Sequence, residues 1–238
     1  MSGAELYDAM AADYRDYAAR RANYLGSVDA FIRQQMPASA RSLLDVGSGD
    51  GHRAMALARA CGIETVVLTD VSSEMVRRCR TLGATEVWQV AAQALPHNGM
   101  RFDVITCLWN VLGHLQGRQD RIAALRRMRD MLAPGGRVFL DVQNRHNATA
   151  YGWGRVLTRV VLDALRPDDR RGDTVFDWKV GDKTIRGSGH LFTPQEIGGL
   201  LSEAGLDIVS RSTFDYATGK QSGSALLGQL VFVCRAGG

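Results

Sequence analysis

The residues best placed to do chemistry form a glycine-rich loop beside acidic side chains. Residues 43–51 read Leu-Leu-Asp-Val-Gly-Ser-Gly-Asp-Gly, and a further carboxylate, Asp70, ends the next apolar run. Glycine has no Cβ, so the loop can turn tightly and bring its backbone close to a ligand. A carboxylate at the end of the second strand can accept hydrogen bonds from both hydroxyls of a ribose. The spacing therefore predicts a nucleotide site.

The charge of this loop indicates which nucleotide it would bind. A dinucleotide-binding loop has the spacing Gly-x-Gly-x-x-Gly, which seats a pyrophosphate on a helix N-terminus. Here the third glycine, Gly51, comes one residue early, and Asp45 and Asp50 lie beside and within the loop. These carboxylates would repel a pyrophosphate and suit a ligand that carries positive charge. A nucleotide-dependent dehydrogenase stays as an alternative, and it predicts binding of NAD.

The loop resembles motif I of the class I methyltransferases that depend on S-adenosylmethionine (SAM), a cofactor with an amino group and a sulfonium. Asp70 has the spacing of that family, and three further segments look like the segment that follows strand two, the start of strand four and the turn before strand five: residues 69–75, 102–105 and 132–137. The resemblance covers about residues 43–140 and 190–234. It implies SAM as the cofactor and S-adenosylhomocysteine (SAH) as the product.

Apolar runs alternate with helical patterns along most of the chain. The predicted strands are 42–46, 65–69, 86–90, 102–108, 137–142, 206–213 and 228–235, and the predicted helices are 4–36 in one or two pieces, 52–60, 75–82, 119–132, 150–165 and one that starts at Thr193. This alternation predicts an α/β fold with ligands at the carboxyl ends of the strands. With the resemblance, it predicts a doubly wound, seven-stranded, mainly parallel sheet of the Rossmann-like methyltransferase type.

We expect one methyltransferase domain over residues 1–238, in four parts. Residues 1–37 are expected to form a helical N-terminal lid and residues 38–142 the SAM-binding core. Residues 143–190 break the strand–helix alternation and are interpreted as an insertion after strand five that caps the substrate. It includes a hairpin at about 176–186 with a turn at Gly181-Asp182. Residues 191–238 would complete the core sheet.

The resemblance implies a set of cofactor contacts. Gly47, Ser48 and Gly49 would face the methionyl part, Asp45 its amino group, and Asp70 the ribose. The remaining implied cofactor-binding residues are Arg20 for the carboxylate, Val71 and Met75 for the adenine, and Ala92, Gln93, Leu108 and Asn110 along the pocket. Where the family has an acidic residue after strand three, this chain has an alanine, so Gln93 or the Ala92 amide would replace it.

Candidate catalytic residues come from three segments. The resemblance implies that a tyrosine of the N-terminal helices, Tyr14, faces the transferred methyl. If the acceptor must lose a proton, His114, Asp141 or His190 could act as the base. The acceptor is expected to contact aromatic and polar side chains that gather in or near the insertion: Tyr7, Trp109, Asn144, Trp153, Trp178 and His190. The same aromatics could instead form the insertion's own small core.

The predicted function is methyl transfer from SAM to a nitrogen of a small, planar heterocyclic metabolite. The methyltransferases of azapteridine (toxoflavin-type) biosynthesis are similar in size and plan. O-methylation of a small molecule and N-methylation of an amino acid or amino sugar are alternatives. A further alternative of another class is a regulatory homologue that binds SAM without catalysis, because a fold does not fix a function.

Composition excludes several other classes. The chain has 238 residues, 45% of them hydrophobic, and a net charge of +4. Its arginines lie on helix faces without an aromatic ladder, which argues against a nucleic-acid partner. The four cysteines form no Cys-x-x-Cys pair, so we expect no metal. The absence of a signal-like or bilayer-length apolar stretch predicts a cytoplasmic protein with no membrane partner. A monomer and a homodimer are both compatible with the sequence.

Overall fold

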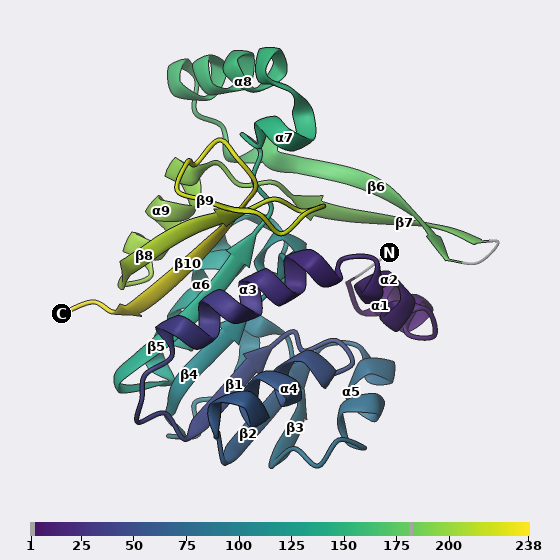
Figure 1. Ribbon diagram of the computed structural model, residues 1–238, viewed down its shortest axis with the longest axis vertical. Coiled ribbons are helices and arrows are strands. Elements are labelled where there is room, and N and C mark those ends of the chain that lie inside the picture. Colours follow the sequence, from purple (N-terminus) through teal and green to yellow (C-terminus); the bar gives the residue numbers. More distant parts are fainter. Residues whose placement is uncertain (1–2, 181–182) are drawn as a thin grey trace.

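A twisted eight-stranded sheet organises the computed structural model of the protein (Figure 1), which describes residues 3–180 and 183–238, and their side chains except at 3, 178–180 and 183. Across the sheet, the strands are β3 (Glu86–Gln89), β2 (Thr65–Asp70), β1 (Ser42–Val46), β4 (Phe102–Cys107), β5 (Leu132–Val142), β10 (Gln229–Ala236), β8 (Leu206–Phe214) and β9 (Gln221–Ser222). From β3 to β5 all neighbours are parallel. β10 runs antiparallel to both β5 and β8.

The expected doubly wound, mainly parallel sheet is confirmed, but it has eight strands instead of seven. The additional strand, β9, has two residues and pairs with the end of β8 through Thr213 and Phe214. Its sequence is Gln-Ser, which is too short and too polar to show the apolar alternation that predicts a strand.

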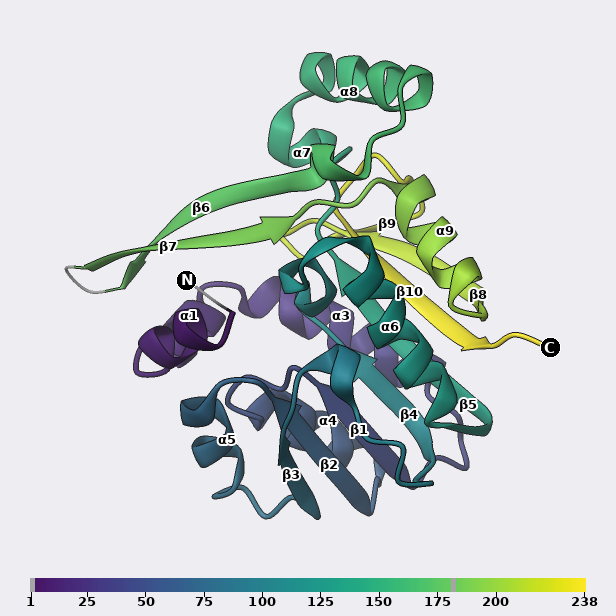
Figure 2. The same ribbon diagram turned by 180° about the vertical axis from the view of Figure 1, so that it is seen from behind.

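Helices cover both faces of the sheet. α3 (Ala22–Gln35) and α4 (His52–Cys61) lie on one face (Figure 1), and α6 (Gly117–Asp130) and α9 (Pro194–Glu203) lie on the other (Figure 2). α3 buries Tyr24, Val28 and Ile32, whose four-residue spacing places them on one side of the helix. α9 begins at Thr193 as predicted, with a capping box in which Thr193 and Glu196 each bond the other's backbone N–H. α5 (Ser73–Cys79) follows β2.

The N-terminal segment folds into two further short helices, α1 (Gly3–Met10) and α2 (Tyr14–Ala19). Leu6 and Met10 of α1 pack on Ile185 in a small apolar cluster. Asp8 accepts hydrogen bonds from the hydroxyl of Ser72 and the N–H of Glu74, at the start of α5. These contacts fix α1 beside the loop that follows β2.

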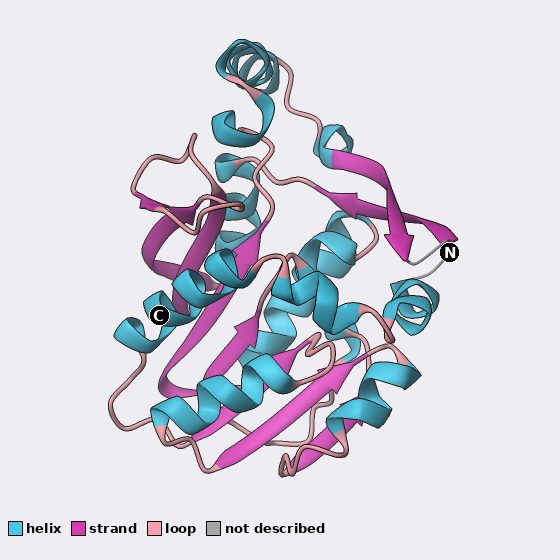
Figure 3. Ribbon diagram, turned by 45° about the vertical axis from the view of Figure 1, so that its right-hand side comes forward, coloured by secondary structure: helices cyan, strands magenta, loops and turns pink. Residues whose placement is uncertain are grey.

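Residues between β5 and α9 lie outside the main sheet. α7 (Ala148–Tyr151) and α8 (Trp153–Leu165) replace the single predicted helix, because Gly152 between them has a φ of +79°. β6 (Asp173–Val180) and β7 (Lys183–His190) form the predicted antiparallel hairpin, which Figure 3 shows apart from the central strands. The predicted turn at Gly181-Asp182 lies outside the described residues. No described helix is both long and apolar enough to cross a bilayer.

Candidate functional site

A cavity of about 490 Å³ opens beyond the carboxyl ends of β1, β2 and β4, and we call it the first cavity. Its volume lies in the range of small-ligand sites. The predicted site residues that line it are Tyr7, Tyr14, Gly47, Gly49, Asp70, Val71, Ala92, Gln93, Leu108, Trp109 and His114. The structure therefore gathers residues from the N-terminal helices and from four strand ends around one space.

The glycine loop forms the floor of the first cavity, and two of its positions require glycine. Gly47 has a φ of +71°, and a Cβ there would lie 2.5 Å from a methyl group of Val111. Gly49 has a φ of +56°, and a Cβ there would overlap with the hydroxyl of Tyr14. Both positions thus combine a left-handed backbone with a close neighbour, as the sequence predicted for a loop that approaches a ligand.

Asp70 faces the first cavity from the end of β2 and also holds the glycine loop. Its carboxylate accepts hydrogen bonds from the N–H of Gly49 at 2.8 Å and the N–H of Ser72 at 2.9 Å. Burial raises the pKa of Asp70 to about 6, although these two N–H groups favour the ionised form. The carboxylate oxygens keep further lone pairs that can accept hydrogen bonds from a ligand.

Asp45 lies on the other side of the loop. Its carboxylate accepts a hydrogen bond from the Thr106 hydroxyl at 2.5 Å, and burial raises its pKa. It lines a third cavity of about 160 Å³ behind Gly47, together with Ser48, Asp50, Arg15 and Arg53 among others. This cavity offers carboxylates and guanidinium groups side by side, which suits a zwitterion.

The arginine chosen from the sequence is not the one that the structure brings to this place. Arg20 is exposed at the end of α2 and lines none of the three cavities. Arg15, five residues earlier, lies 3.4 Å from Asp50, and Arg53 on α4 lies 2.8 Å from Asp29. Five residues correspond to about 140° around a helix, so Arg15 and Arg20 point in different directions.

A second cavity of about 250 Å³ adjoins the first, with Tyr7, Tyr14, Trp109 and His114 common to both. Its other lining residues are Met10, Tyr17, Asn110, Gln143, Tyr151, Thr174, Phe176, Gly189, Leu191 and Tyr216. Among these described residues none is an aspartate, glutamate, lysine or arginine. The second cavity is therefore aromatic and neutral, whereas the first is lined by two carboxylates, Asp70 and Asp120.

The four shared residues form a partition between the cavities. The Tyr7 hydroxyl lies 3.1 Å from Nε2 of His114. Burial lowers the pKa of His114, so its imidazole is neutral at neutral pH and can accept a proton. Burial raises the pKa of Tyr7 and Tyr14, so both phenols keep their protons. The partition thus places one potential base and two hydroxyl donors between the two cavities.

Trp109 forms the aromatic part of this partition. Its ring stacks on Tyr17 at 5.3 Å between centroids and meets Tyr14 edge-on at 5.7 Å. Its indole N–H donates to the Tyr216 hydroxyl at 2.9 Å. Tyr17 and Tyr216 were not chosen from the sequence as site residues. Tyr216 is the second residue after the end of β8, and this position past a strand end is the signal that could have found it.

The turn that carries Trp109 is strained. Trp109 and Asn110 have φ values of +62° and +63°, and residues other than glycine rarely adopt this left-handed region. Asp141, buried at the end of β5, accepts hydrogen bonds from the N–H of Asn110 at 2.8 Å and the hydroxyl of Tyr24 at 2.9 Å. Asp141 lines none of the three cavities, so the structure does not bring this predicted base to the reacting groups.

Other predicted residues also lie elsewhere. Met75 is fully buried and lines none of the cavities, because its side chain is part of the packed core. Asn144 donates its amide N–H groups to the carbonyls of Ala225 and Gly228. Trp153 is 54% exposed on α8, and the side chain of Trp178 lies outside the described part of the chain.

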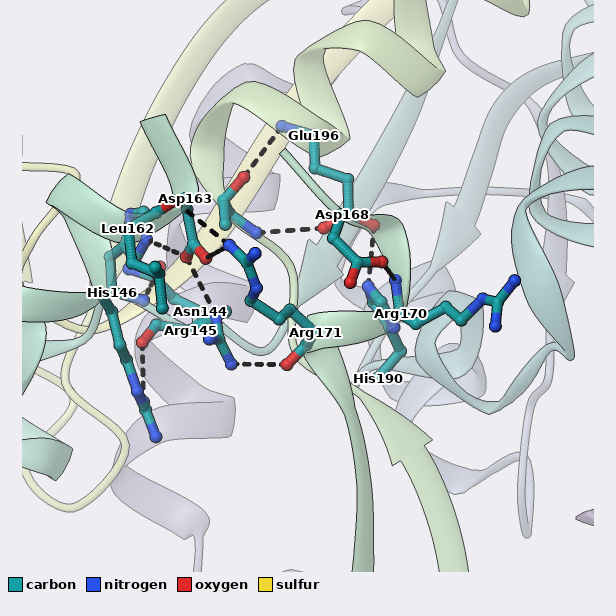
Figure 4. A network of polar contacts seen from close by, with 12 residues as sticks. Asn144, Arg145, His146, Leu162, Asp163, Asp168, Arg170, Arg171, His190 and Glu196 are labelled. Atoms are coloured by element: carbon teal, nitrogen blue, oxygen red, sulfur yellow. Dashed lines mark hydrogen bonds and ion pairs between the residues drawn. The ribbon is translucent and has the colours of Figure 1, made fainter. Parts of the chain in front are cut away.

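His190 is buried between two carboxylates rather than facing an acceptor. Its Nδ1 lies 2.7 Å from Asp173 and its Nε2 2.7 Å from Glu196, so it ties the hairpin to α9 (Figure 4). Over residues 3–180 and 183–238, no group of three or more histidine, cysteine, aspartate or glutamate side chains could hold a metal ion.

Comparison with known proteins relates this site to a family. The family model described as "Methyltransferase domain" matches residues 11–211. The chain is 32% identical over 142 residues to the dTDP-3-amino-3,6-dideoxy-alpha-D-glucopyranose N,N-dimethyltransferase of Streptomyces fradiae, which covers 58% of the chain and 52% of that protein. It is 33% identical over 121 residues to the ubiquinone biosynthesis O-methyltransferase of Methylococcus capsulatus, with 48% of each covered. The chain thus spans about half the length of these curated relatives.

Among solved structures, the SAM-bound amino pentose methyltransferase CalS10 from Micromonospora echinaspora superposes with a TM-score of 0.64 at 18% identity, over 93% of this chain and 95% of that one. This likeness confirms the fold. None of these three relatives is an azapteridine methyltransferase, so that narrower resemblance stays a prediction. The family model covers most of the chain, and its match agrees with the glycine loop and with Asp70 at the end of β2. The chain therefore belongs to the methyltransferase domain family.

Proposed function

We propose that the protein transfers a methyl group from SAM to a nitrogen of a small, neutral acceptor that has a planar ring. The observation that carries this proposal is the junction of the two cavities. A cavity with the glycine loop and the carboxylate of Asp70 meets a neutral aromatic cavity at Tyr7, Tyr14, Trp109 and His114. A transfer reaction needs two adjoining sites of this kind, so that the two reactants meet in one orientation.

The residues of the first and third cavities fit SAM. Asp70 would accept hydrogen bonds from the ribose hydroxyls, and Ala92 and Gln93 line the space left for the adenine. Asp45 and Asp50 would hold the amino group, with Arg15 or Arg53 for the carboxylate. The resemblance implies that Arg20 pairs with this carboxylate, but Arg20 lies outside the three cavities. We therefore assign the carboxylate to Arg15 or Arg53 instead. Bound there, SAM supplies an activated methyl group on a positively charged sulfur, and the protein supplies position and electrostatics.

The partition would position the acceptor and remove its proton. Tyr14 and Trp109 exclude water from the junction and hold a planar ring by stacking. A proton released by the acceptor can pass through the Tyr7 hydroxyl to Nε2 of His114, since these two atoms lie 3.1 Å apart. General-base assistance of this kind contributes roughly 10²–10⁴-fold to a rate.

The neutral second cavity supports an uncharged acceptor over a free amino acid. A zwitterion would leave its charges without partners among the described lining residues, and an unpaired buried charge is costly. The neutral imidazole of His114 also favours a second candidate, O-methylation of a phenol, because a hydroxyl acceptor must lose a proton. One of the two curated relatives compared above is an O-methyltransferase and the other is an N,N-dimethyltransferase.

The test is incubation with SAM carrying a deuterated methyl group and a panel of heterocyclic amines, phenols, amino sugars and amino acids. Mass spectrometry of the products identifies both acceptor and accepting atom. Transfer to a ring nitrogen supports the proposal, and transfer to a phenol oxygen supports the second candidate. Tight binding of SAH by calorimetry without transfer to any compound supports a regulatory protein. Binding of NAD in place of SAH would contradict all three.

A further inference from the structure

The helix α8 turns an apolar side to solvent. Trp153, Leu157, Val161 and Leu165 recur every fourth residue, which aligns them along one side of the helix. They are between 54% and 76% exposed. We call these four residues the α8 stripe. Val156, on the other side, is fully buried. A helix at the surface of a protein ordinarily places its apolar side against the core, so this arrangement is reversed.

The orientation of α8 is fixed by charged groups beneath it. Asp163 lies 3.0 Å from Nε of Arg145, 2.9 Å from Nε2 of His146 and 3.2 Å from Nη1 of Arg171 (Figure 4). Arg159 donates to the carbonyl oxygen of Arg145 at 3.0 Å. Rotating α8 to bury the stripe would break these contacts and leave the half-buried carboxylate of Asp163 without its partners. The stripe therefore stays exposed unless another molecule covers it.

Basic side chains border the stripe. Arg155 lies in the first turn of α8, and Arg166 is the residue directly after the helix. Both are exposed, and neither forms an ion pair within the part of the chain that the structure describes. Arg170, just beyond the helix, extends its guanidinium away from the network in Figure 4. An apolar stripe with a basic flank is complementary to an anionic surface.

A second copy of this chain would cover the stripe over only a small area. A helix of 13 residues is only about 20 Å long. Its one apolar side is small for a stable interface, which buries roughly 1,200–2,000 Å².

We propose that α8 docks on the headgroup region of a membrane that contains anionic lipids, with the stripe inserted and Arg155 and Arg166 against the phosphates. An amphipathic helix with a Trp and aliphatic side, basic flanks and too short a length to span is typical of interfacial binding. Tyr151, two residues before α8, lines the second cavity. Docking would thus bring the second cavity near the lipid surface, where a lipophilic acceptor concentrates, and this last step rests on the proposed function.

The test is cosedimentation of the full chain with vesicles, which needs neither SAM nor acceptor. Vesicles of phosphatidylcholine and phosphatidylglycerol in equal parts are expected to pellet the protein, and vesicles of phosphatidylcholine alone are not. The double variant Leu157→Ser/Leu165→Ser should reduce binding by about tenfold or more. Arg155→Gln should reduce it about fivefold, and salt should weaken it in the parent. Ile208→Ser, an exposed apolar residue on β8, is the matched control and should bind as the parent does.

Folding of each variant is checked by its thermal transition and by SAH binding, which these surface changes should leave unchanged. The proposal is overturned if the protein does not pellet with anionic vesicles, or if the double variant pellets like the parent. It is also overturned if light scattering shows a dimer that the double variant converts to a monomer, or if only an acidic protein partner binds the stripe. Vesicle binding without any methyl transfer would refute the proposed function and leave this inference standing.

Discussion

Lowering the pH should weaken cofactor binding at Asp70 while it stabilises the cofactor-free protein. The pKa of this carboxyl is raised by burial from 3.8 to about 6. Between these values the folded protein binds more protons at Asp70 than the unfolded chain does. Its stabilising contribution is therefore complete below pH 3.8 and is lost as the pH rises through 6. The difference of about 2 pKa units corresponds to roughly 3 kcal/mol of unfolding free energy.

Binding should respond in the opposite direction. The ribose hydroxyls need an ionised carboxylate as their acceptor, and protonation replaces one acceptor oxygen by a donor. Below about pH 6 the affinity for SAH should fall by up to tenfold per pH unit, and above about pH 7 this contribution should level off. Calorimetric titration with SAH from about pH 5 to about pH 7.5 measures the affinity, and urea unfolding of the cofactor-free protein at the same pH values measures the stability.

Two variants separate Asp70 from the other carboxyl groups. Burial also raises the pKa of Asp45, so this group too makes the unfolding free energy fall as the pH rises. Asp70→Asn should remove the part of the pH dependence of the unfolding free energy that comes from Asp70 and leave the part that comes from Asp45. Asp103→Asn is the matched control at the opposite end of the sheet, where backbone N–H groups hold the pKa of Asp103 low. An SAH affinity that stays constant between about pH 5 and about pH 7 would refute this reasoning, as would an unchanged unfolding slope in Asp70→Asn.

Three other substitutions test separate parts of the site. Gly49→Ala should weaken SAH binding in calorimetry, because it adds about 1–2 kcal/mol of backbone strain and a steric overlap with Tyr14. Gly83→Ala is the control: Gly83 has a φ of +74° with open space around it, so this variant should lose stability from backbone strain alone. Tyr24→Phe should lower the unfolding free energy by about 1.5–3 kcal/mol and raise the KM for the acceptor at unchanged SAH affinity, because Asp141 loses a donor. His114→Gln should reduce kcat by roughly 10²-fold or more at unchanged SAH affinity, and an unchanged kcat would show that the acceptor enters without a proton to lose.

The core of the fold could be predicted because its signals are local. The strand before the glycine loop, the loop itself and Asp70 lie within 29 residues of sequence, and each has a composition that its conformation requires. The capping box at Thr193 is likewise written in four consecutive residues. β9 could not be predicted, because two polar residues show no periodicity. It is a strand only because it pairs with the end of β8, and the sequence does not show that pairing.

The partition between the cavities could be predicted only in part, because it depends on contacts between distant segments. Tyr7 and His114 are 107 residues apart, as are Trp109 and Tyr216. Sequence spacing identifies the strand ends but does not say which N-terminal side chain reaches them. The choice between Arg15 and Arg20 depends on which side of a six-residue helix faces the loop. That side is set by packing against the rest of the molecule rather than by the helix itself.

Asp141 shows how a residue type that suits acid–base chemistry can serve the site in another way. Two consecutive left-handed residues, Trp109 and Asn110, cost roughly 1–2 kcal/mol each. Burial raises the pKa of Asp141, while Arg53 and the donors from Asn110 and Tyr24 favour its ionised form. Hydrogen bonds to a charged group are worth about 1.5–3 kcal/mol, so in the ionised form these donors can offset this strain. An asparagine at position 141 has a single side-chain oxygen, so it could not accept both hydrogen bonds, from Asn110 and from Tyr24, on two equivalent oxygens. The wall that Trp109 forms against the acceptor therefore depends on a carboxylate that does not reach the acceptor itself. On this argument Asp141 is a positioning residue, and its loss should displace the indole before it changes any proton transfer.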